Sequence, residues 1–267
     1  MTGEPGNSET VSSTDTGTFG KVMAVLDLVL SADEPLRFTD ILQRAGQPRG
    51  TLHRQLAHLV REGLLVAGPD GSYSPGLRLL RLAHRSWSRH SFRSVAEPHL
   101  ARLNAITGET VHLGVLSGAD IVYIDKVESR QGVRMGSQIG KASPVYCTGL
   151  GKAAISLLPD PALEALLAGL QFVRHTPQTL ADADALRREV EEIRAAGYAL
   201  DREEHEEGIR CVAAPIRAGT DDVVAGISVT GPAYRVSLPQ LLDWSPVVRA
   251  TAAEIGRDWR LRLGLFR

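Results

Sequence analysis

The segment from Pro48 to Glu62 carries basic and hydrogen-bonding side chains in a spacing that suits contact with nucleic acid. At about 100° per residue of helix, one face gathers the apolar side chains Leu52, Leu56, Leu59 and Val60. The opposite face carries basic side chains, Arg54 central among them. A guanidinium can pair with a guanine edge in the major groove of DNA, and the N–H groups that begin a helix attract phosphate. An ordinary amphipathic surface helix is the alternative interpretation.

A phosphate-binding loop is suggested by Gly151-Lys152, but the motif is incomplete. Tyr146 stands where its first glycine belongs, and Ala153 replaces the Ser or Thr that would bind Mg²⁺. The chain has two cysteines, Cys147 and Cys211, far apart in sequence. Two cysteines exclude a disulfide framework and an all-cysteine metal site.

Two hydrolase motifs are also incomplete. His205-Glu206 suggests a zinc protease, but Ile209 stands where the second histidine belongs. A nucleophile elbow around Ser228 fails because Thr230 replaces its second glycine. We therefore expect no metal, no cofactor and no catalytic residue, and keep an enzyme acting on a small acid as a minor alternative.

The composition is that of an ordinary globular chain. Of its 267 residues, 43% are hydrophobic and 23% charged, with a net charge of −1. The best apolar run, Val22 to Leu30, is too short to span a bilayer and contains Asp27. Residues 1–18 are rich in Gly, Ser and Thr and lack Lys and Arg. They predict a disordered leader rather than a signal peptide, and so a cytoplasmic chain without a membrane partner.

Charge is unevenly distributed along the chain. The span from Phe19 to Arg93 has a net charge of +5, whereas the leader and the remainder each have −3. Such asymmetry predicts two domains with different partners. A solvated arginine face on a helix between Arg78 and Arg93 is the alternative.

The elements of the basic third follow the order of a winged helix-turn-helix. Hydrophobic periodicity predicts helices over 19–31, 38–45 and 48–62, the second ended by Gly46 and the third opened by Pro48. Two strands, 64–67 and 72–74, flank the turn Pro69-Asp70-Gly71. A long helix, about Leu77 to His90, then leads into the second part.

The second part alternates strand pairs with helices. Helices are predicted over 95–106, 148–158, 161–168, 182–196 and 238–263. Strands are predicted over 110–116, 121–127, 133–135, 198–201, 210–217 and 223–230. Together the two parts predict an α+β protein, with a mostly antiparallel sheet in an α/β sensor domain.

One motif in the first part and four in the second, all in register, resemble the IclR-type transcriptional regulators. The DNA-reading segment Gln47-Pro48-Arg49-Gly50-Thr51-Leu52-His53-Arg54 is similar to the start of the family's recognition helix. The remaining landmarks are Gly149-Leu150-Gly151-Lys152-Ala153, Gly197-Tyr198-Ala199-Leu200-Asp201 followed by Glu203-Glu204-His205, Gly208 to Ile216, and Ile227 to Pro232. The resemblance covers about Phe19 to Arg260.

The resemblance implies a winged helix-turn-helix over 19–76, a linker helix over 77–92 and a GAF-like effector-binding domain over 93–263. It implies DNA contacts from one helix: Arg49, Gly50, Thr51, His53, Arg54 and His58. Gly50 departs from the hydroxyl residue frequent in the family, and Arg37 departs from the usual Ser or Thr cap. Thr39 is expected to cap one turn later, or the cap is absent.

The resemblance also implies an effector site. Its residues map onto Met135, Gly149, Leu150, Asp201, Ile209, Cys211, Ser228 and Thr230. Leu150 and Thr230 are bulkier than the Ala and Ser often found in the family. Backbone N–H groups at Gly149 and Leu150, with the two hydroxyls, suit a carboxylate. Because an ionised Asp201 would repel that carboxylate, we expect it at the other end of the ligand, where it accepts a hydrogen bond from a hydroxyl.

These features predict a sequence-specific, DNA-binding transcriptional regulator that is not an enzyme. We expect a repressor whose operator affinity responds to a small organic acid, with an activator as the alternative. A ligand-independent architectural DNA binder is the other rival. One winged helix reads too few base pairs for genomic specificity, so we expect a homodimer or a tetramer built as a dimer of dimers.

Overall fold

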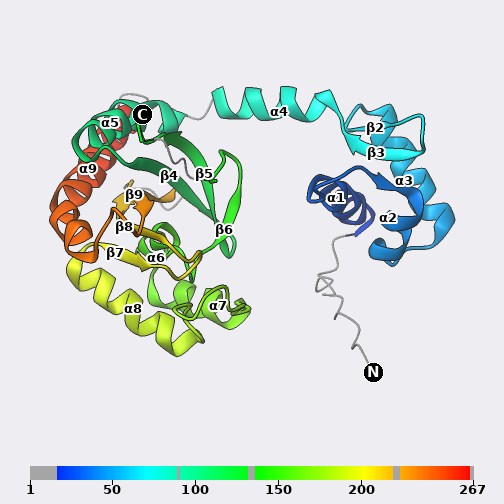
Figure 1. Ribbon diagram of the computed structural model, residues 1–267. Helices are drawn as coiled ribbons and strands as arrows, with labels where there is room; N and C mark the ends of the chain where they lie inside the picture. Colours follow the sequence, from blue (N-terminus) through cyan, green and yellow to red (C-terminus); the bar gives the residue numbers. More distant parts are fainter. Residues whose placement is uncertain (1–16, 89–90, 132–135, 219–222, 265–267) are drawn as a thin grey trace. The chain divides into compact units, whose positions relative to one another are not determined.

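The computed structural model describes residues 17–88, 91–131, 136–218 and 223–264 (Figure 1). The chain divides between residues 89 and 90 into two compact units. We call residues 17–88 the first unit and residues 91–264 the second unit. The predicted leader lies outside the described residues as far as residue 16, and its last two positions are helical instead.

The first unit is a three-helix fold with a small antiparallel sheet. Its elements are α1 (Gly17–Leu30), β1 (Leu36–Arg37), α2 (Phe38–Ala45), α3 (Arg49–Arg61), β2 (Leu65–Ala67), β3 (Ser72–Pro75) and α4 (Leu77–Ser88). The strand order is β1-β3-β2, so β3 pairs with both neighbours. The core is formed by Val25, Leu26, Val29, Leu36, Ile41, Leu52, Leu56, Leu59 and Leu65. This arrangement is a winged helix-turn-helix, as the sequence predicts.

Local sequence signals set the limits of α2 and α3. Gly46 ends α2 in the left-handed region at φ 60°, and Pro48 is the N-cap of α3. At the start of α2 the backbone N–H of Arg37 donates to the Asp40 carboxylate at 3.0 Å. Of the two alternatives, the cap by Thr39 is therefore wrong, and the absence of a side-chain cap is confirmed. An acidic side chain in the first turn binds the N-cap backbone instead.

The second unit contains one six-stranded sheet and five helices among its described residues. The strands are β4 (Thr110–Ser117), β5 (Asp120–Val127), β6 (Ala142–Pro144), β7 (Ala199–Arg202), β8 (Ile209–Arg217) and β9 (Val224–Pro232). The helices are α5 (Ser91–Thr107), α6 (Gly149–Ile155), α7 (Asp160–Gly169), α8 (Ala183–Ala196) and α9 (Leu238–Gly264). The strand order is β6-β5-β4-β9-β8-β7, and every neighbouring pair is antiparallel.

Helices cover both faces of this sheet (Figure 1). Along β8, Val212, Ala214 and Ile216 face the core beneath α5 and α9. Ala213, between them, faces the opposite core beneath α6. The period of two thus divides one strand between two apolar layers. The α6 face is the one that carries the polar residues described below.

The observed limits differ from the predicted ones at a few places. β1 and β6 are additional strands, and α5 begins at Ser91, four residues before its predicted start, with Pro98 inside it. α4 ends at Ser88, and the end of its predicted range lies outside the described residues, as does the strand predicted over 133–135. Among the described residues, no helix is both long and apolar enough to cross a membrane.

Candidate functional site

Helix α3 separates an apolar face from a basic one. Leu52 and Leu56 are fully buried, and Leu59 is nearly so. The candidate DNA contacts Arg49, Gly50, His53, Arg54 and His58 are exposed, and Thr51 is half-buried. The structure thus brings all six candidates onto one helix with their side chains largely available to solvent. The hairpin of β2 and β3, the wing, follows this helix in the chain.

The wing is held by one aspartate. The Asp70 carboxylate accepts from the backbone N–H of Ser72 at 3.2 Å and from its hydroxyl at 2.6 Å. Gly71 adopts φ 77°, which a residue with a side chain rarely adopts. These contacts stabilise the turn between β2 and β3. The hairpin lies beside α3, since α3 and β2 are in contact.

The second unit encloses a cavity of about 300 Å³ between the sheet and α6. Of the eight candidate effector residues, the cavity wall brings together Leu150, Asp201, Ile209, Cys211, Ser228 and Thr230. Gly149 lies directly behind this wall, where a Cβ would come within 2.6 Å of the Cys211 Sγ. Met135 lies outside the described residues.

Sheet register explains how residues distant in sequence meet in this wall. Asp201 pairs with Cys211, and Cys211 pairs with Thr230, so the three form one row across β7, β8 and β9. Ser228 stands two residues from Thr230 and pairs with His112 on β4. Directly paired residues and residues two apart share a face. These five side chains therefore lie on the α6 face.

Two glycines let α6 approach the sheet. A Cβ on Gly114 would come within 2.6 Å of the Leu150 Cδ2 atom, and one on Gly226 within 3.1 Å of its Cδ1 atom. The two glycines pair with each other across β4 and β9. The Leu150 side chain therefore packs directly on the backbone of Gly114 and Gly226, and it forms one side of the cavity.

The cavity also contains residues that sequence reasoning missed. They are His112, Tyr123, Gly136, Ser137, Lys141, Ser143, Thr148, His205 and Glu206. His112 bridges two hydroxyls, with Nε2 2.7 Å from Ser137 Oγ and Nδ1 3.3 Å from Thr230 Oγ1. Burial, with the nearby charge of Lys126, lowers the pKa of His112 to about 3, so its ring is neutral. Its signal in the sequence is a polar residue within an otherwise apolar strand.

Tyr123 forms part of the floor beside His112, with ring centroids 5.1 Å apart. Burial raises the pKa of Tyr123 to about 12, against the effect of a hydrogen bond with Ser143. The phenol is therefore neutral. Lys141, by contrast, is exposed and contributes a cation to the lining. The wall as a whole combines neutral hydrogen-bonding groups and an apolar surface with two exposed charged residues, Lys141 and Glu206, which suits a small polar molecule.

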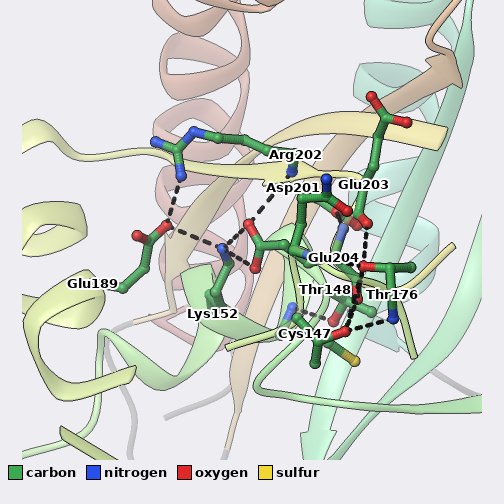
Figure 2. A network of polar contacts seen from close by, with 12 residues as sticks. Cys147, Thr148, Lys152, Thr176, Glu189, Asp201, Arg202, Glu203 and Glu204 are labelled. Carbon is green, nitrogen blue, oxygen red and sulfur yellow. Dashed lines mark hydrogen bonds and ion pairs between the residues drawn. The ribbon is translucent and has the colours of Figure 1, made fainter. Parts of the chain in front are cut away.

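Asp201 is the buried carboxyl group of this wall, and Figure 2 shows its neighbours. Its Oδ1 accepts the backbone N–H of Glu204 at 2.8 Å. Burial and the charge of Glu204 together raise the pKa of Asp201 to about 7, while the backbone N–H groups of Glu204 and Glu203 and the charge of Lys152 oppose the shift. This carboxyl is therefore partly protonated near neutral pH.

The relative position of Gly149 and Asp201 bears on the expected ligand orientation, which stays a prediction. A Cβ on Gly149 would lie 3.2 Å from the Asp201 nitrogen and 3.4 Å from its Cβ. The backbones of Gly149 and Asp201 thus lie side by side. The expected orientation assumes an ionised Asp201, whereas burial favours the protonated form, which does not repel a carboxylate.

The thiols of the second unit are not activated. The backbone N–H of Gly149 is directed at the Cys211 sulfur, but burial raises the pKa of this thiol far above its ordinary value. Burial and the charge of Asp201 raise the pKa of Cys147 to about 12. Because the thiolate is the nucleophile, neither cysteine is poised for covalent chemistry. In the described part of the chain, no cluster of His, Cys, Asp or Glu could hold a metal ion.

Comparison with known proteins follows the same division into two parts. A family model for the IclR helix-turn-helix domain matches residues 19–69. A second model, for the C-terminal part of the bacterial transcriptional regulator IclR, matches residues 84–257. The chain belongs to the IclR family.

Three similar proteins illustrate the range of the IclR family. The transcriptional regulator XynR of Escherichia coli is 34% identical over 89% of this chain and 94% of its own length. The repressor AllR of Klebsiella pneumoniae is 30% identical over 95% and 93%. An IclR homologue of Microbacterium hydrocarbonoxydans, solved with 4-hydroxybenzoate, is 27% identical over 92% and 100%, with a TM-score of 0.73. An IclR regulator thus combines a helix-turn-helix domain with a C-terminal effector domain, as this chain does.

Proposed function

We propose that this IclR-family chain is a repressor in the cytoplasm, and that a small organic acid bound in the second-unit cavity changes its affinity for operator DNA. The basic face of α3 supports the DNA contact. Arg54 stands at its centre with an exposed side chain, and Arg49 lies at the N-terminal end. A guanidinium at the centre suits a base edge, whereas one at the helix start suits phosphate.

The observation that carries the proposal is the composition of the cavity wall. Ser228, Thr230 and neutral His112 supply hydrogen-bonding groups, Lys141 supplies positive charge, and Asp201 is partly protonated. Such a wall accommodates a monoanion with a small polar or aromatic body. The relative solved with 4-hydroxybenzoate holds an aromatic hydroxy acid, which belongs to this class.

We also propose that the functional form is a homodimer or a dimer of such dimers. Leu77 and Leu80 stand on one side of α4 and are 78% and 68% exposed. Phe19 on α1 is 76% exposed. Light scattering at micromolar concentration should give at least twice the monomer mass. A monomeric mass together with full operator affinity would contradict this assembly.

Footprinting tests the proposed function. The probe is the DNA that flanks the chain's own gene, with and without a panel of small oxo-, hydroxy- and phenolic acids. We expect a protected, palindromic site whose protection changes with at least one acid. Transcription from the adjacent promoter should rise when the gene is deleted, and a fall would indicate the activator. Protection that no acid changes would indicate an architectural DNA binder.

A further inference from the structure

A buried ionic cluster lies behind the cavity wall (Figure 2). The side chain of Lys152 is fully buried, and its Nζ donates to both Glu204 carboxylate oxygens at 2.6 and 2.7 Å. It also donates to Glu189 Oε1 at 3.0 Å. Glu204 is 4% exposed and Glu189 is 14% exposed. These three charges lie on α6, on α8 and in the segment after β7.

Glu204 also holds the Asp201 carboxyl in position through hydrogen bonds of its backbone. Its backbone N–H binds Asp201 Oδ1, while its backbone carbonyl accepts the hydroxyl of Thr179 at 2.7 Å. Glu203, between them, has φ 71°, the one positive φ outside glycine among the described residues. This strained turn places the Glu204 side chain on Lys152 and its N–H on Asp201 at the same time.

The cluster is neutral only without a charge on Asp201. Lys152 and Arg202, whose guanidinium lies 3.4 Å from Glu189 Oε1, supply two positive charges. Glu189 and Glu204 supply two negative ones. An ionised Asp201 would therefore add an unbalanced negative charge in a buried place, which is costly.

We propose that Lys152 and Glu204 are positioning residues of the ligand cavity. The Lys152 ammonium favours the ionised form of Glu204 and so opposes the effect of burial, which raises the pKa of Glu204. Glu204 holds the Asp201 carboxyl in place through its backbone N–H, and its side-chain charge favours the protonated form of Asp201. Oδ1 then accepts the Glu204 N–H, and the second oxygen carries the proton toward the ligand. Asp201 thus meets the ligand as a hydrogen-bond donor.

The other groups around Asp201 do not replace this control. Facing it are Cys211 on β8, Cys147 before α6, and Tyr123 on β5, besides Lys152 on α6 and Glu204. Burial raises the pKa of both thiols and of the phenol, so all three are neutral at pH 7. Lys141, His205 and Glu206 line the same cavity, but the charges that act most strongly on Asp201 are those of Glu204 and Lys152.

The proton on Asp201 should affect which ligands bind in the cavity, an inference that rests on the proposed function. A protonated Asp201 can donate to a carboxylate or phenolate oxygen, whereas an ionised Asp201 would repel it. Binding of an anionic acid should therefore take up a proton at a pH where the free protein has lost it. The cavity would prefer anions over the matching amides, even though its wall contains a carboxyl group.

The titration of Asp201 in the free protein tests the inference without any ligand. Carbon-13 NMR of aspartate-labelled full-length chain reports each carboxyl, and Asp201→Asn assigns the signal. We expect a midpoint near pH 7 in the wild type and a midpoint lower by about one unit or more in Glu204→Gln. Glu192→Gln removes an equal charge from the exposed side of α8 and should leave the midpoint unchanged. A wild-type midpoint near 4 overturns the inference whether or not the Glu204 variant folds.

Calorimetry then tests the link to the ligand. The probe is 4-hydroxybenzoate, measured at pH 8 in two buffers of different ionisation enthalpy. Uptake of about one proton by the wild type, and of clearly less by Glu204→Gln, supports the inference. Binding without proton uptake contradicts it. Failure of this and every other acid to bind would contradict the proposed effector function instead, while the NMR titration still decides the state of Asp201.

Discussion

The guanidinium carbon of Arg49 lies 5.2 Å from the centre of the Phe38 ring. The first residue of α3 is thereby held against the first residue of α2, beside the N–H groups that begin α3. A cation in this position suits a phosphate rather than a base edge. Changing Arg49 to Ala should weaken binding to operator and random DNA by a similar factor. The slope of log affinity against log salt should become shallower by about one, measured by fluorescence anisotropy.

Arg54 should behave differently, because it projects from the middle of the exposed face of α3. Arg54→Ala should weaken binding to the operator by about 1–3 kcal/mol and relax discrimination at one base pair. Competition assays with single base-pair variants of the footprinted site measure this. Equal losses on operator and random DNA would remove Arg54 from base reading.

The packing of Leu150 on Gly114 and Gly226 predicts an effect on the free energy of unfolding. Gly114→Ala should lower the free energy of unfolding by about 1–3 kcal/mol, since the new Cβ would stand 2.6 Å from Leu150 Cδ2 and 2.8 Å from Ile121 Cγ1. Leu150→Ala alone should cost about 2–5 kcal/mol because Leu150 is buried, and Gly114→Ala should cost less in that background than in the wild type. Gly169→Ala, whose Cβ would meet nothing within 4 Å, is the matched control in urea unfolding. Equal stability of the two alanine variants would contradict the close approach of α6.

Asp201 predicts a dependence of stability on pH. The pKa of Asp201 in the folded protein is about 7, above its ordinary value of 3.8. The stability that this carboxyl contributes to the folded state is therefore fully present below pH 3.8 and is lost as the pH rises through 7. Asp201→Asn removes the free-energy cost of ionising a buried carboxyl at high pH. The variant should therefore exceed the wild type in free energy of unfolding by roughly 2–4 kcal/mol at pH 8, and by little at pH 4. Asp243→Asn, at an exposed position, is the control. A difference that does not change with pH would show that folding leaves the pKa of Asp201 at its ordinary value.

Most of the fold can be predicted from the sequence because the residues that begin and end its helices act locally. Gly46 and Pro48 mark the ends of α2 and α3, and the observed limits lie within a residue of those predicted. β1 and β6 could not be predicted, because two or three residues are too few to show alternation. Their strand conformation comes from pairing with β3 and β5, which is a long-range effect.

The cavity shows a similar limit. The family motifs point to Asp201, Cys211 and Thr230 one strand at a time, but only the register of the sheet places them in one row. His112 and Tyr123 could not be predicted for the same reason. The sequences of β4 and β5 do not show which strands of the sheet they pair with. The protonation of Asp201 also depends on burial and on Glu204, neither of which spacing can reveal.

The most direct test of the account is the affinity for operator DNA with and without an acid in the cavity. Fluorescence anisotropy on the footprinted site should show the Kd rising by about 5- to 150-fold when a binding acid saturates the wild type. Asp201→Ala and Ser228→Ala should keep the acid-free Kd and lose most of this response, because both residues line the cavity and neither is in the DNA-binding unit. An operator Kd that no acid of the panel changes would contradict the account.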